Sequence, residues 1–282
     1  MTTHPVWFIT GTSTGFGRAI AEEALARGAA VVAAARKLDD IADLVARSPD
    51  RVLAVKLDVT RESDVRDAVA AALARFGRID VLVNNAGYGI VGAVEETPDQ
   101  ELRAQFETNF FGAMALTRQV LPHMRERRSG TIVNISSLGG QSTAPGFGAY
   151  CATKFALEAM SEALAAEVKP LGIGVLIVEP GSFRTAFAGH ALRSMPAIEA
   201  YAASVGPTRA FADGMHGTQA GDPTKAAKAI ADVVGRADMP LRLPLGADAI
   251  AAIKTHLQTV GDELARWESV ARATGFATGE TP

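Results

Sequence analysis

Short apolar runs alternate with longer stretches of helical periodicity along most of the chain. The runs are rich in Val and Ile and predict six strands, at residues 6–10, 30–36, 52–57, 81–84, 131–136 and 174–179. Most are apolar throughout, as expected for strands that helices cover on both faces of a parallel sheet. Amphipathic helices are expected between them, at 18–27, 63–76, 99–127 and 149–168. The pattern therefore predicts an α/β fold with a doubly wound parallel sheet in three layers.

The pattern weakens after Thr185. Residues 186–222 show little periodicity, and Met195-Pro196 and Gly206-Pro207 predict breaks there. The rest of the chain predicts a helix from Pro223, a strand at 241–245 and an amphipathic helix at 248–270. Because no linker, repeat or low-complexity tract interrupts the chain, we expect one domain over residues 1–282. Within it, residues 186–222 would form a substrate-binding lid, and 240–282 a C-terminal strand, helix and tail.

Composition and charge narrow the classes of function. The chain has 282 residues, is 48% hydrophobic and carries a net charge of −3 with both signs mixed, so nucleic-acid and membrane partners are not expected. No apolar run reaches the roughly 18 residues of a membrane helix, and the N-terminus lacks the basic region of a secretory signal. Cys151 is the only cysteine and is expected to be a buried structural thiol, and the five histidines lack metal-ligand spacing. These observations predict a cytoplasmic protein without a metal.

A glycine-rich segment follows the first predicted strand and opens the first predicted helix. It reads Thr10-Gly11-Thr12-Ser13-Thr14-Gly15-Phe16-Gly17. Glycines permit a tight turn and a close approach of the backbone to a pyrophosphate, toward which the helix N-terminus directs its free N–H groups. A plain strand–helix turn is the alternative, because such a loop alone is a weak signal. Its place in a strand–helix series favours a dinucleotide site on a Rossmann fold.

The spacing TGxxxGxG differs from the GxGxxG of ordinary dehydrogenases and resembles the short-chain dehydrogenase/reductase family. Further motifs follow in the family's order: Asn84-Asn85-Ala86-Gly87, Ser137 thirteen residues before Tyr150, the YxxxK motif Tyr150-Cys151-Ala152-Thr153-Lys154, and Pro180-Gly181. The resemblance extends from Val6 to Thr185. It implies an oxidoreductase that moves a hydride between a nicotinamide cofactor and a carbonyl or secondary alcohol.

The resemblance also implies a catalytic tetrad of Asn109, Ser137, Tyr150 and Lys154. Tyr150 would be the general acid/base, and Lys154, one helical turn away on the same face, would lower its pKa together with the oxidised nicotinamide. Ser137 would hydrogen-bond the substrate oxygen, and the family's spacing selects it over Ser136. In the family, the asparagine that matches Asn109 bends its helix and holds a water leading to the lysine.

The second predicted strand ends without the acid that usually binds the ribose of NAD. In the family, Ala35 occupies the position of that acid, and the guanidinium of Arg36 suits a 2′-phosphate. We therefore expect NADP(H) rather than NAD, although Arg36 could instead begin a solvated helix. Asp58 matches the residue beside the adenine, the alternative being a turn in which Thr60 caps the next helix. By resemblance the cofactor site comprises Gly11, Thr12, Ser13, Thr14, Gly15, Phe16, Gly17, Arg36, Asp58, Val59, Asn85, Ala86, Gly87, Tyr150, Lys154, Pro180, Gly181, Phe183 and Thr185.

The segments that set specificity in the family are largely apolar here. They predict a bulky apolar ketone, aldehyde or secondary alcohol, held by Tyr88, Val91, Phe147, Phe183, Phe187, Met195 and Tyr201. The predicted 149–168 helix is apolar on more than one face, which predicts a homodimer or homotetramer. Two other functions stay open. One is a redox-inactive NADP-binding regulator, expected to have a broken tetrad, and the other a nucleotide-sugar epimerase or dehydratase, which usually has a different glycine spacing.

Overall fold

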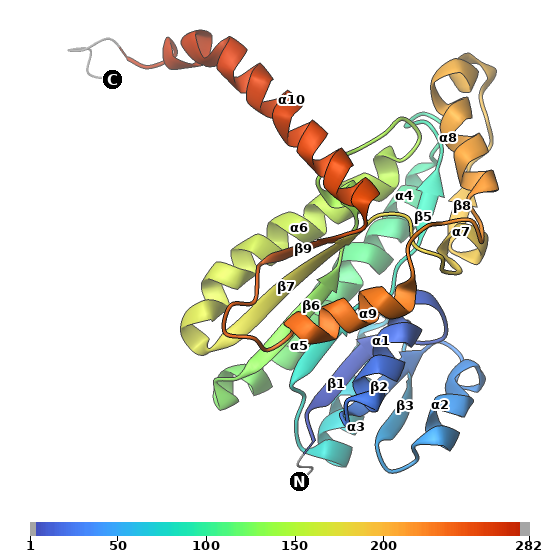
Figure 1. Cartoon of the computed structure of the whole chain (residues 1–282), viewed down its shortest axis with the longest axis vertical. Helices are drawn as coiled ribbons and strands as arrows, with labels where there is room; N and C mark the ends of the chain where they lie inside the picture. Colours follow the sequence, from blue (N-terminus) through green and yellow to red (C-terminus); the bar gives the residue numbers. More distant parts are fainter. Residues whose placement is uncertain (1–3, 277–282) are drawn as a thin grey trace.

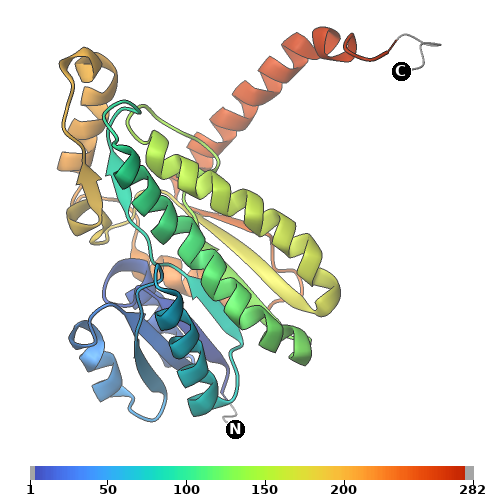
Figure 2. The ribbon, with the colours of Figure 1, turned by 180° about the vertical axis from the view of Figure 1, so that it is seen from behind.

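A computed structural model of the chain describes residues 4–276 and confirms the α/β class. Seven parallel strands form one sheet in the order β3-β2-β1-β4-β6-β7-β9, with helices on both faces (Figures 1 and 2). The strands are β1 (Val6–Thr10), β2 (Ala30–Ala35), β3 (Val52–Lys56), β4 (Val81–Asn84), β6 (Gly130–Ile135), β7 (Ile173–Pro180) and β9 (Arg242–Leu245). Each predicted strand is present to within about one residue at its ends.

Two hydrophobic clusters cover the two faces of the sheet. On one face lie α3 (Glu62–Phe76), α5 (Gly112–Arg127) and α6 (Gly148–Val168), and on the other α1 (Gly15–Ala26), α2 (Ala42–Arg47) and α9 (Pro223–Val233). Successive side chains of a strand point to opposite faces, so Phe8 of β1 joins the first cluster and Ile9 the second. This double burial explains why the strands are apolar throughout.

The predicted 99–127 helix is interrupted by one irregular turn. It consists of α4 (Asp99–Phe106), a π-helical turn (Glu107–Phe111) and α5. Asn109 lies in the π turn and is buried. The irregularity therefore falls at the residue for which the family resemblance implied a bend.

Residues 186–222 contain more regular structure than the sequence predicted. They form α7 (Phe187–His190), β8 (Leu192–Ser194) and α8 (Ala202–Gly214), and β8 pairs with β5 (Gly89–Val91) in a small parallel sheet. The predicted break at Gly206-Pro207 is wrong, because α8 continues through Pro207. Proline removes one helical hydrogen bond, but Ala203, whose carbonyl loses its donor, is exposed, where water can replace the bond.

A buried ion pair attaches this segment to the rest of the domain. A carboxylate oxygen of Glu96 lies 2.6 Å from the Arg209 guanidinium of α8, and the other accepts a 2.7 Å hydrogen bond from the Ile198 N–H. These contacts, with the contribution of the Ala93 N–H, hold the pKa of Glu96 below its ordinary value. The segment is thus fastened at a defined point beside β5.

The chain ends in a long helix, α10 (Ala247–Arg272), as predicted to within two residues at either end. It follows β9 and projects away from the body of the domain (Figure 1). The tail beyond residue 276 lies outside the described residues.

Candidate active site

The motifs meet at one edge of the sheet. The glycine loop, the Asn84–Gly87 motif, Ser137 and Pro180-Gly181 follow β1, β4, β6 and β7, which are neighbours in the sheet. Because these strands are parallel, their carboxyl ends share one edge, where open α/β folds bind their ligands. The fold therefore brings together residues that are up to about 170 positions apart in the chain.

The glycine loop has the backbone that its sequence predicted. Gly11 and Gly15 have φ angles of +69° and +61°, in the region that favours glycine. A Cβ on Gly17 would lie 2.3 Å from the Gly11 carbonyl oxygen and 2.5 Å from Asn85 Nδ2, so no side chain fits there. The N-cap residue of α1, Thr14, makes no side-chain capping bond within the described residues. The first N–H groups of α1 are thus available to an anion, and the loop fits the pyrophosphate of a dinucleotide.

Asn85 and Thr10 connect the glycine loop to the next strand end. Asn85 Nδ2 donates to the Thr10 carbonyl at 2.8 Å, and the N–H groups of Asn85 and Ala86 both donate to Thr10 Oγ1 at 2.9 Å. Asn84 instead points into the core, where its amide donates to Asn134 and Thr117. Within the motif, Asn84 therefore stabilises the core, whereas Asn85 and Ala86 fix the shape of the glycine loop, which we call the cradle.

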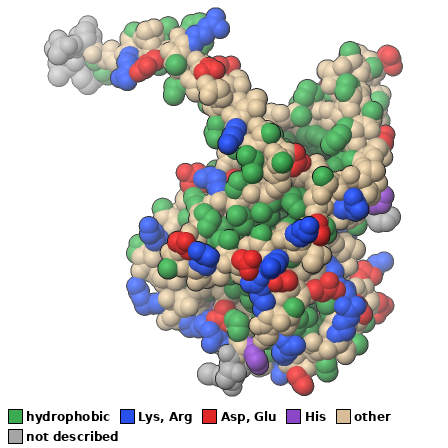
Figure 3. Space-filling model, in the orientation of Figure 1, with side chains coloured by type: hydrophobic (Ala, Val, Ile, Leu, Met, Phe, Trp, Pro, Cys, Tyr) green, Lys and Arg blue, Asp and Glu red, His purple; other side chains and the backbone are tan. Residues whose placement is uncertain are grey.

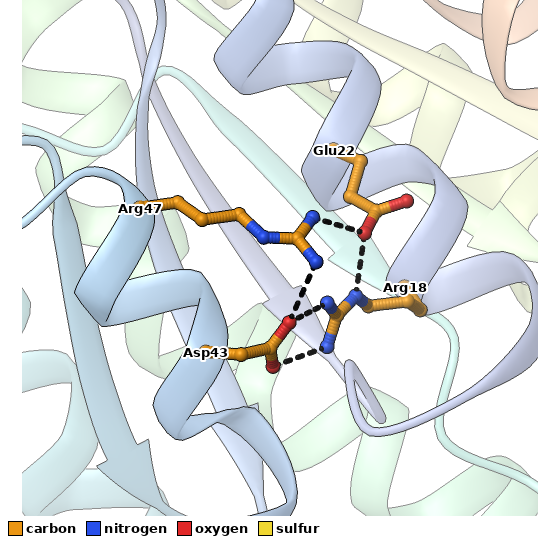
Figure 4. Close-up of polar contacts among 4 residues, drawn as sticks. All are labelled: Arg18, Glu22, Asp43 and Arg47. Carbon is orange, nitrogen blue, oxygen red and sulfur yellow. Dashed lines mark hydrogen bonds and ion pairs between the residues drawn. The ribbon is translucent and has the colours of Figure 1, made fainter.

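The end of β2 leaves one arginine free for a ligand. Ala35 is buried, and Arg36 is exposed and makes no hydrogen bond or ion pair with the described residues. Arg18 and Arg47, by contrast, share Glu22 and Asp43 between α1 and α2 (Figure 4). Both of these guanidiniums are paired with carboxylates, whereas Arg36 forms no ion pair with the described residues.

Asp58 lies close enough to Arg36 to interact electrostatically. Partial burial raises the pKa of Asp58, but hydrogen bonds from the Thr60 hydroxyl and N–H, together with Arg61 and Arg36, bring it below its ordinary value. The Thr60 hydroxyl donates to Asp58 Oδ1 at 2.7 Å. The expected capping role of Thr60 is therefore wrong: α3 begins at Glu62, after Arg61, and its start has no side-chain cap.

Ser137 and Tyr150 meet above the end of β6. A side-chain hydrogen bond joins them, and Ser137 Oγ also accepts a 3.0 Å bond from the Gly139 N–H. Ser136 is buried on the other side of the chain, near Glu158, so only Ser137 faces the tyrosine. Cys151 is buried as expected, and burial raises the pKa of its thiol.

Lys154 projects from α6 toward the same place. Its Nζ lies 5.8 Å from the Tyr150 ring centroid and donates to the Ile135 carbonyl at 2.8 Å. Burial lowers the pKa of Lys154 to about 8 and raises that of Tyr150 to about 12, the Ser137 bond opposing the latter shift. The pKa of Tyr150 thus lies above its ordinary value and not below it as expected, because desolvation of the hydroxyl outweighs the effect of Ser137.

Asn109 is joined to the tetrad through Thr153. Asn109 Nδ2 donates to the Tyr88 carbonyl at 2.9 Å and to Thr153 Oγ1 at 3.0 Å, while Oδ1 accepts from the Tyr88 N–H. Thr153 Oγ1 in turn donates to the Tyr150 carbonyl at 2.7 Å. Thr153 was not predicted as a site residue, although its place within YxxxK, on the helix turn between Tyr150 and Lys154, was a usable signal.

A buried pair of carboxyl groups lies one turn beyond Lys154. The carboxyl groups of Glu158 of α6 and Glu179 of β7 lie close enough to shift each other's pKa, and Arg242 of β9 lies 3.2 Å from Glu158 and 3.4 Å from Glu179. Burial, followed by the charge of Glu158, raises the pKa of Glu179 to about 7. This group was not predicted from the sequence, because its three members are far apart in the chain.

Aromatic rings surround Tyr150. The rings of Phe187 and Phe147 lie 5.6 and 6.3 Å from its centroid, so α7 of the 186–222 segment reaches the tyrosine. The guanidinium of Arg193, which was not predicted as a site residue, lies 4.5 Å from the ring centroid of Tyr88 and 3.3 Å from a carboxylate oxygen of Glu101. These contacts make an apolar surface with an ion pair at its edge.

Several other residues that were expected to hold the substrate do not lie beside Tyr150 in this way. Val91 is fully buried and Met195 is 9% exposed, so neither lines an open surface. Val91 ends β5, and Met195 follows β8, the strand that pairs with β5. Tyr201 donates to Glu95. Phe183 packs on Phe16 of the glycine loop at 5.1 Å.

The segment after β7 contacts the glycine loop. A Cβ on Gly15 would lie 3.4 Å from Thr185 Cβ, and Thr185 Oγ1 accepts a 3.3 Å bond from the Phe187 N–H. Gly181, which follows Pro180, is tightly enclosed by Asp248, the second residue of α10. Val59 is also close-packed, against Gly112 of α5. The structure thus brings the expected cofactor positions around one cradle, apart from Val59, which packs against α5.

Known proteins resemble this arrangement over most of the chain. A family model described as short chain dehydrogenase matches residues 5–196. Oxidoreductase BOA17 of Botryotinia fuckeliana is 41% identical over 95% of this chain and 99% of its own. The chain belongs to the short-chain dehydrogenase/reductase family. The 3-ketodihydrosphingosine reductase of Bacteroides thetaiotaomicron is 39% identical over 84% of this chain and 86% of its own.

Solved structures of this family have the same fold. A short-chain dehydrogenase from Streptomyces avermitilis is 52% identical, with a TM-score of 0.92 over 98% of this chain and 100% of that one. A 3-ketoacyl-(acyl-carrier-protein) reductase from Brucella melitensis, in complex with NADH, is 28% identical, with a TM-score of 0.72 over 86% and 96%. ElxO, with NADP bound, is 25% identical, with a TM-score of 0.73 over 88% and 100%. Nicotinamide nucleotides of both kinds are therefore bound by similar structures.

No group of three or more His, Cys, Asp or Glu residues is arranged to hold a metal ion among residues 4–276. Within the same residues, no helix combines the length and the apolar character required to cross a membrane.

Proposed function

We propose that this short-chain dehydrogenase/reductase transfers a hydride between NADP(H) and a carbonyl or secondary alcohol carbon, with Tyr150 as general acid/base. The observation that carries the proposal is the meeting of Ser137, Tyr150 and Lys154 beside the glycine cradle. The intact tetrad argues against a redox-inactive regulator. The glycine spacing argues against a nucleotide-sugar epimerase or dehydratase.

In the direction of reduction, the residues of the chain manage the substrate oxygen and its proton. When bound, the reduced nicotinamide supplies the hydride, that is, two electrons and one hydrogen nucleus for the carbonyl carbon. Ser137 hydrogen-bonds the carbonyl oxygen and orients it toward Tyr150. The Tyr150 hydroxyl donates its proton as charge develops on that oxygen, and the nearby Lys154 ammonium stabilises the tyrosinate that remains. Oxidation of an alcohol runs through the same groups in reverse.

The preference for NADP(H) rests on the end of β2. Arg36 is exposed and unpaired among the described residues, while neighbouring Arg18 and Arg47 are neutralised by carboxylates. A guanidinium binds phosphate oxygens through parallel charge-assisted hydrogen bonds, and the buried methyl of Ala35 offers no carboxylate to the ribose. The exposed Arg36 therefore favours a 2′-phosphate.

The substrate class follows from the surface around Tyr150. The rings of Phe147 and Phe187 favour a bulky apolar ketone, aldehyde or secondary alcohol. The reductase of 3-ketodihydrosphingosine among the relatives, which acts on a keto compound, supports this class. We further propose residues 186–222 as the lid over this surface. We also infer a homo-oligomer, because α6 exposes the apolar side chains of Phe155 and Met160. A cytoplasmic location is proposed from the single cysteine, which fits a reducing compartment.

A cofactor and substrate matrix tests the proposal. Initial rates of nicotinamide absorbance change are measured with NADPH or NADH against apolar ketones and aldehydes of increasing size. We expect turnover with NADPH, rising with substrate size. NADPH should bind at least about tenfold more tightly than NADH, which is about 1.4 kcal/mol. Absence of turnover with any carbonyl or alcohol would contradict the proposed chemistry.

The variant Arg36→Ala tests the cofactor preference separately. It should weaken NADPH and leave NADH nearly unchanged, because only the former carries the 2′-phosphate. Lys37→Ala, at the next exposed position, is the matched control. Equal losses for both cofactors would make Arg36 merely structural.

A further inference from the structure

Helix α10 carries an apolar stripe with a seven-residue repeat. Its members follow one another at alternating steps of three and four residues: Ile250, Ile253, Leu257, Val260, Leu264, Trp267 and Ala271. Such spacing fills the a and d positions of a heptad and creates a seam along one side of a helix. The repeat continues over almost the whole helix. This is the signature of a helix that pairs with another helix.

Beyond the half-buried Ile253, none of residues 4–276 covers this stripe. Ala249, in the first turn, is the only buried residue of α10, while Leu257, Leu264 and Trp267 are 56%, 70% and 57% exposed. The helix projects from the body, with hydrophobic side chains on its surface (Figures 1 and 3). At about 1.5 Å per residue it extends roughly 39 Å. A surface helix draws most of its stability from packing, so this stripe calls for a partner.

We infer that α10 pairs in antiparallel orientation with α10 of a second copy of this chain. In one antiparallel register, the apolar stripe of one copy packs against the same stripe of the other copy. Leu257 would face Val260 of the other copy, Leu264 would face Ile253, and Ile250 would face Trp267. Each a residue thus meets a d residue, and the two-fold axis passes between residues 258 and 259. Such an interface is closed and self-complementary.

Charge decides the orientation. In a parallel, in-register pair, Glu263 at g would face Glu268 at the following e position of the other copy, and the like charges would repel. In the antiparallel register, Glu263 faces His256 of the other copy, whose imidazole can donate a hydrogen bond to the carboxylate. Gly261, at an e position beside the seam, adds no side chain to hinder the approach of the second backbone.

The polar faces of α10 do not suit a lipid surface. They carry four acidic residues, Asp248, Asp262, Glu263 and Glu268, and three basic ones, Lys254, Arg266 and Arg272. Helices that lie on membranes usually gather basic residues on the polar face, which attracts anionic headgroups. The mixed charge of α10 instead suits a protein partner with the same pattern.

Two adjacent substitutions test the pairing. Leu264→Glu places a charge in the seam, whereas Ala265→Glu places the same charge on the outer side of the helix. Both positions are exposed, so the domain should unfold at the same temperature in each variant. We expect light scattering of the full chain to show a halving of particle mass for Leu264→Glu at micromolar concentration and no change for Ala265→Glu. An unchanged mass for Leu264→Glu would overturn the pairing.

Disulfide trapping tests the register. Leu257→Cys protein and Val260→Cys protein are oxidised separately and as a mixture, with the buried Cys151 present throughout. The antiparallel register predicts covalent dimers in the mixture only, each joining one molecule of either variant. Covalent dimers of Val260→Cys alone would contradict the antiparallel orientation.

A vesicle flotation experiment tests the alternative that the stripe binds a lipid surface. Wild-type protein and Leu264→Glu are mixed with phosphatidylcholine vesicles, with and without phosphatidylserine. We expect no flotation of either. Flotation that Leu264→Glu abolishes without a change in particle mass would assign the stripe to a lipid surface and overturn the proposal.

Discussion

Lys154 and Tyr150 lie close together, and desolvation shifts their pKa values in opposite directions. Desolvation penalises the charged form of each group, so it raises the pKa of the tyrosine to about 12 and lowers that of the lysine to about 8. At neutral pH the tyrosine keeps its proton and the lysine keeps its charge. Both states suit the reduction of a carbonyl.

The pKa of Lys154 predicts how the rate of carbonyl reduction depends on pH. As the pH rises through about 8, Lys154 loses the charge that stabilises the tyrosinate, so kcat/KM for reduction should fall in that range. Lys154→Arg should move the fall to higher pH, because a guanidinium stays protonated. The measurement is the pH profile of kcat/KM at saturating NADPH for both proteins. A wild-type profile that is flat between pH 7 and 9 would count against this role of Lys154.

The carboxyl pair predicts how stability changes with pH. The pKa of Glu179 is about 7 in the folded protein, above the ordinary value of 4.5, so the folded state holds its proton more tightly than the unfolded state does. The contribution to stability is therefore complete below pH 4.5 and is lost as the pH rises through about 7. Glu179→Gln, which cannot ionise, should exceed the wild type in unfolding free energy by about 1–2 kcal/mol at pH 8 and match it near pH 4.5.

Denaturant unfolding at several pH values measures this difference. Glu162→Gln is the control, because Glu162 also pairs with Arg242 but its side chain is 64% exposed. A constant difference between Glu179→Gln and wild type at all pH values would show that Glu179 does not titrate in this range.

At the scale of elements, the glycine loop makes the sharpest steric prediction. Gly17→Ala would push a methyl group to within 2.3 Å of the Gly11 carbonyl, so the loop must open and the nucleotide should bind at least about tenfold more weakly. Gly206→Ala is the matched control. Gly206 lies inside α8, far from the nucleotide cradle, so this change should leave NADPH affinity unchanged, and Pro207 directly after it offsets the stability that alanine usually adds inside a helix. Titration of both variants with NADPH and thermal unfolding check these outcomes.

Some helices and strands could be predicted from local sequence signals alone, and others could not. Strands such as β1 and β2 were predictable because burial on both faces imposes an uninterrupted apolar run. The three-residue strands β5 and β8 gave no such run, and their pairing joins residues about 100 positions apart. Pro207 misled the prediction because local propensity does not reveal that the affected turn of α8 lies at the surface.

At the scale of the whole molecule, the site residues that belong to sequence motifs could be predicted. Groups that form only where distant parts of the chain meet could not. The tetrad and the glycine cradle lie within motifs of fixed spacing. The group of Glu158, Glu179 and Arg242 does not, since only the order of β7 and β9 in the sheet places them together. The contact of Phe187 with Tyr150 likewise depends on how the 186–222 segment folds back over α6.

We propose Tyr150 as the proton donor of the hydride transfer, and Tyr150→Phe is the sharpest test of this role. The change removes only the hydroxyl, so the ring contacts with Phe147 and Phe187 and the nucleotide cradle should remain. The account predicts that single-turnover reduction of an accepted ketone slows by about 10²–10⁴-fold while NADPH affinity stays within a few-fold. A Phe variant that keeps more than about a tenth of the wild-type rate, with chemistry rate-limiting, would contradict the account.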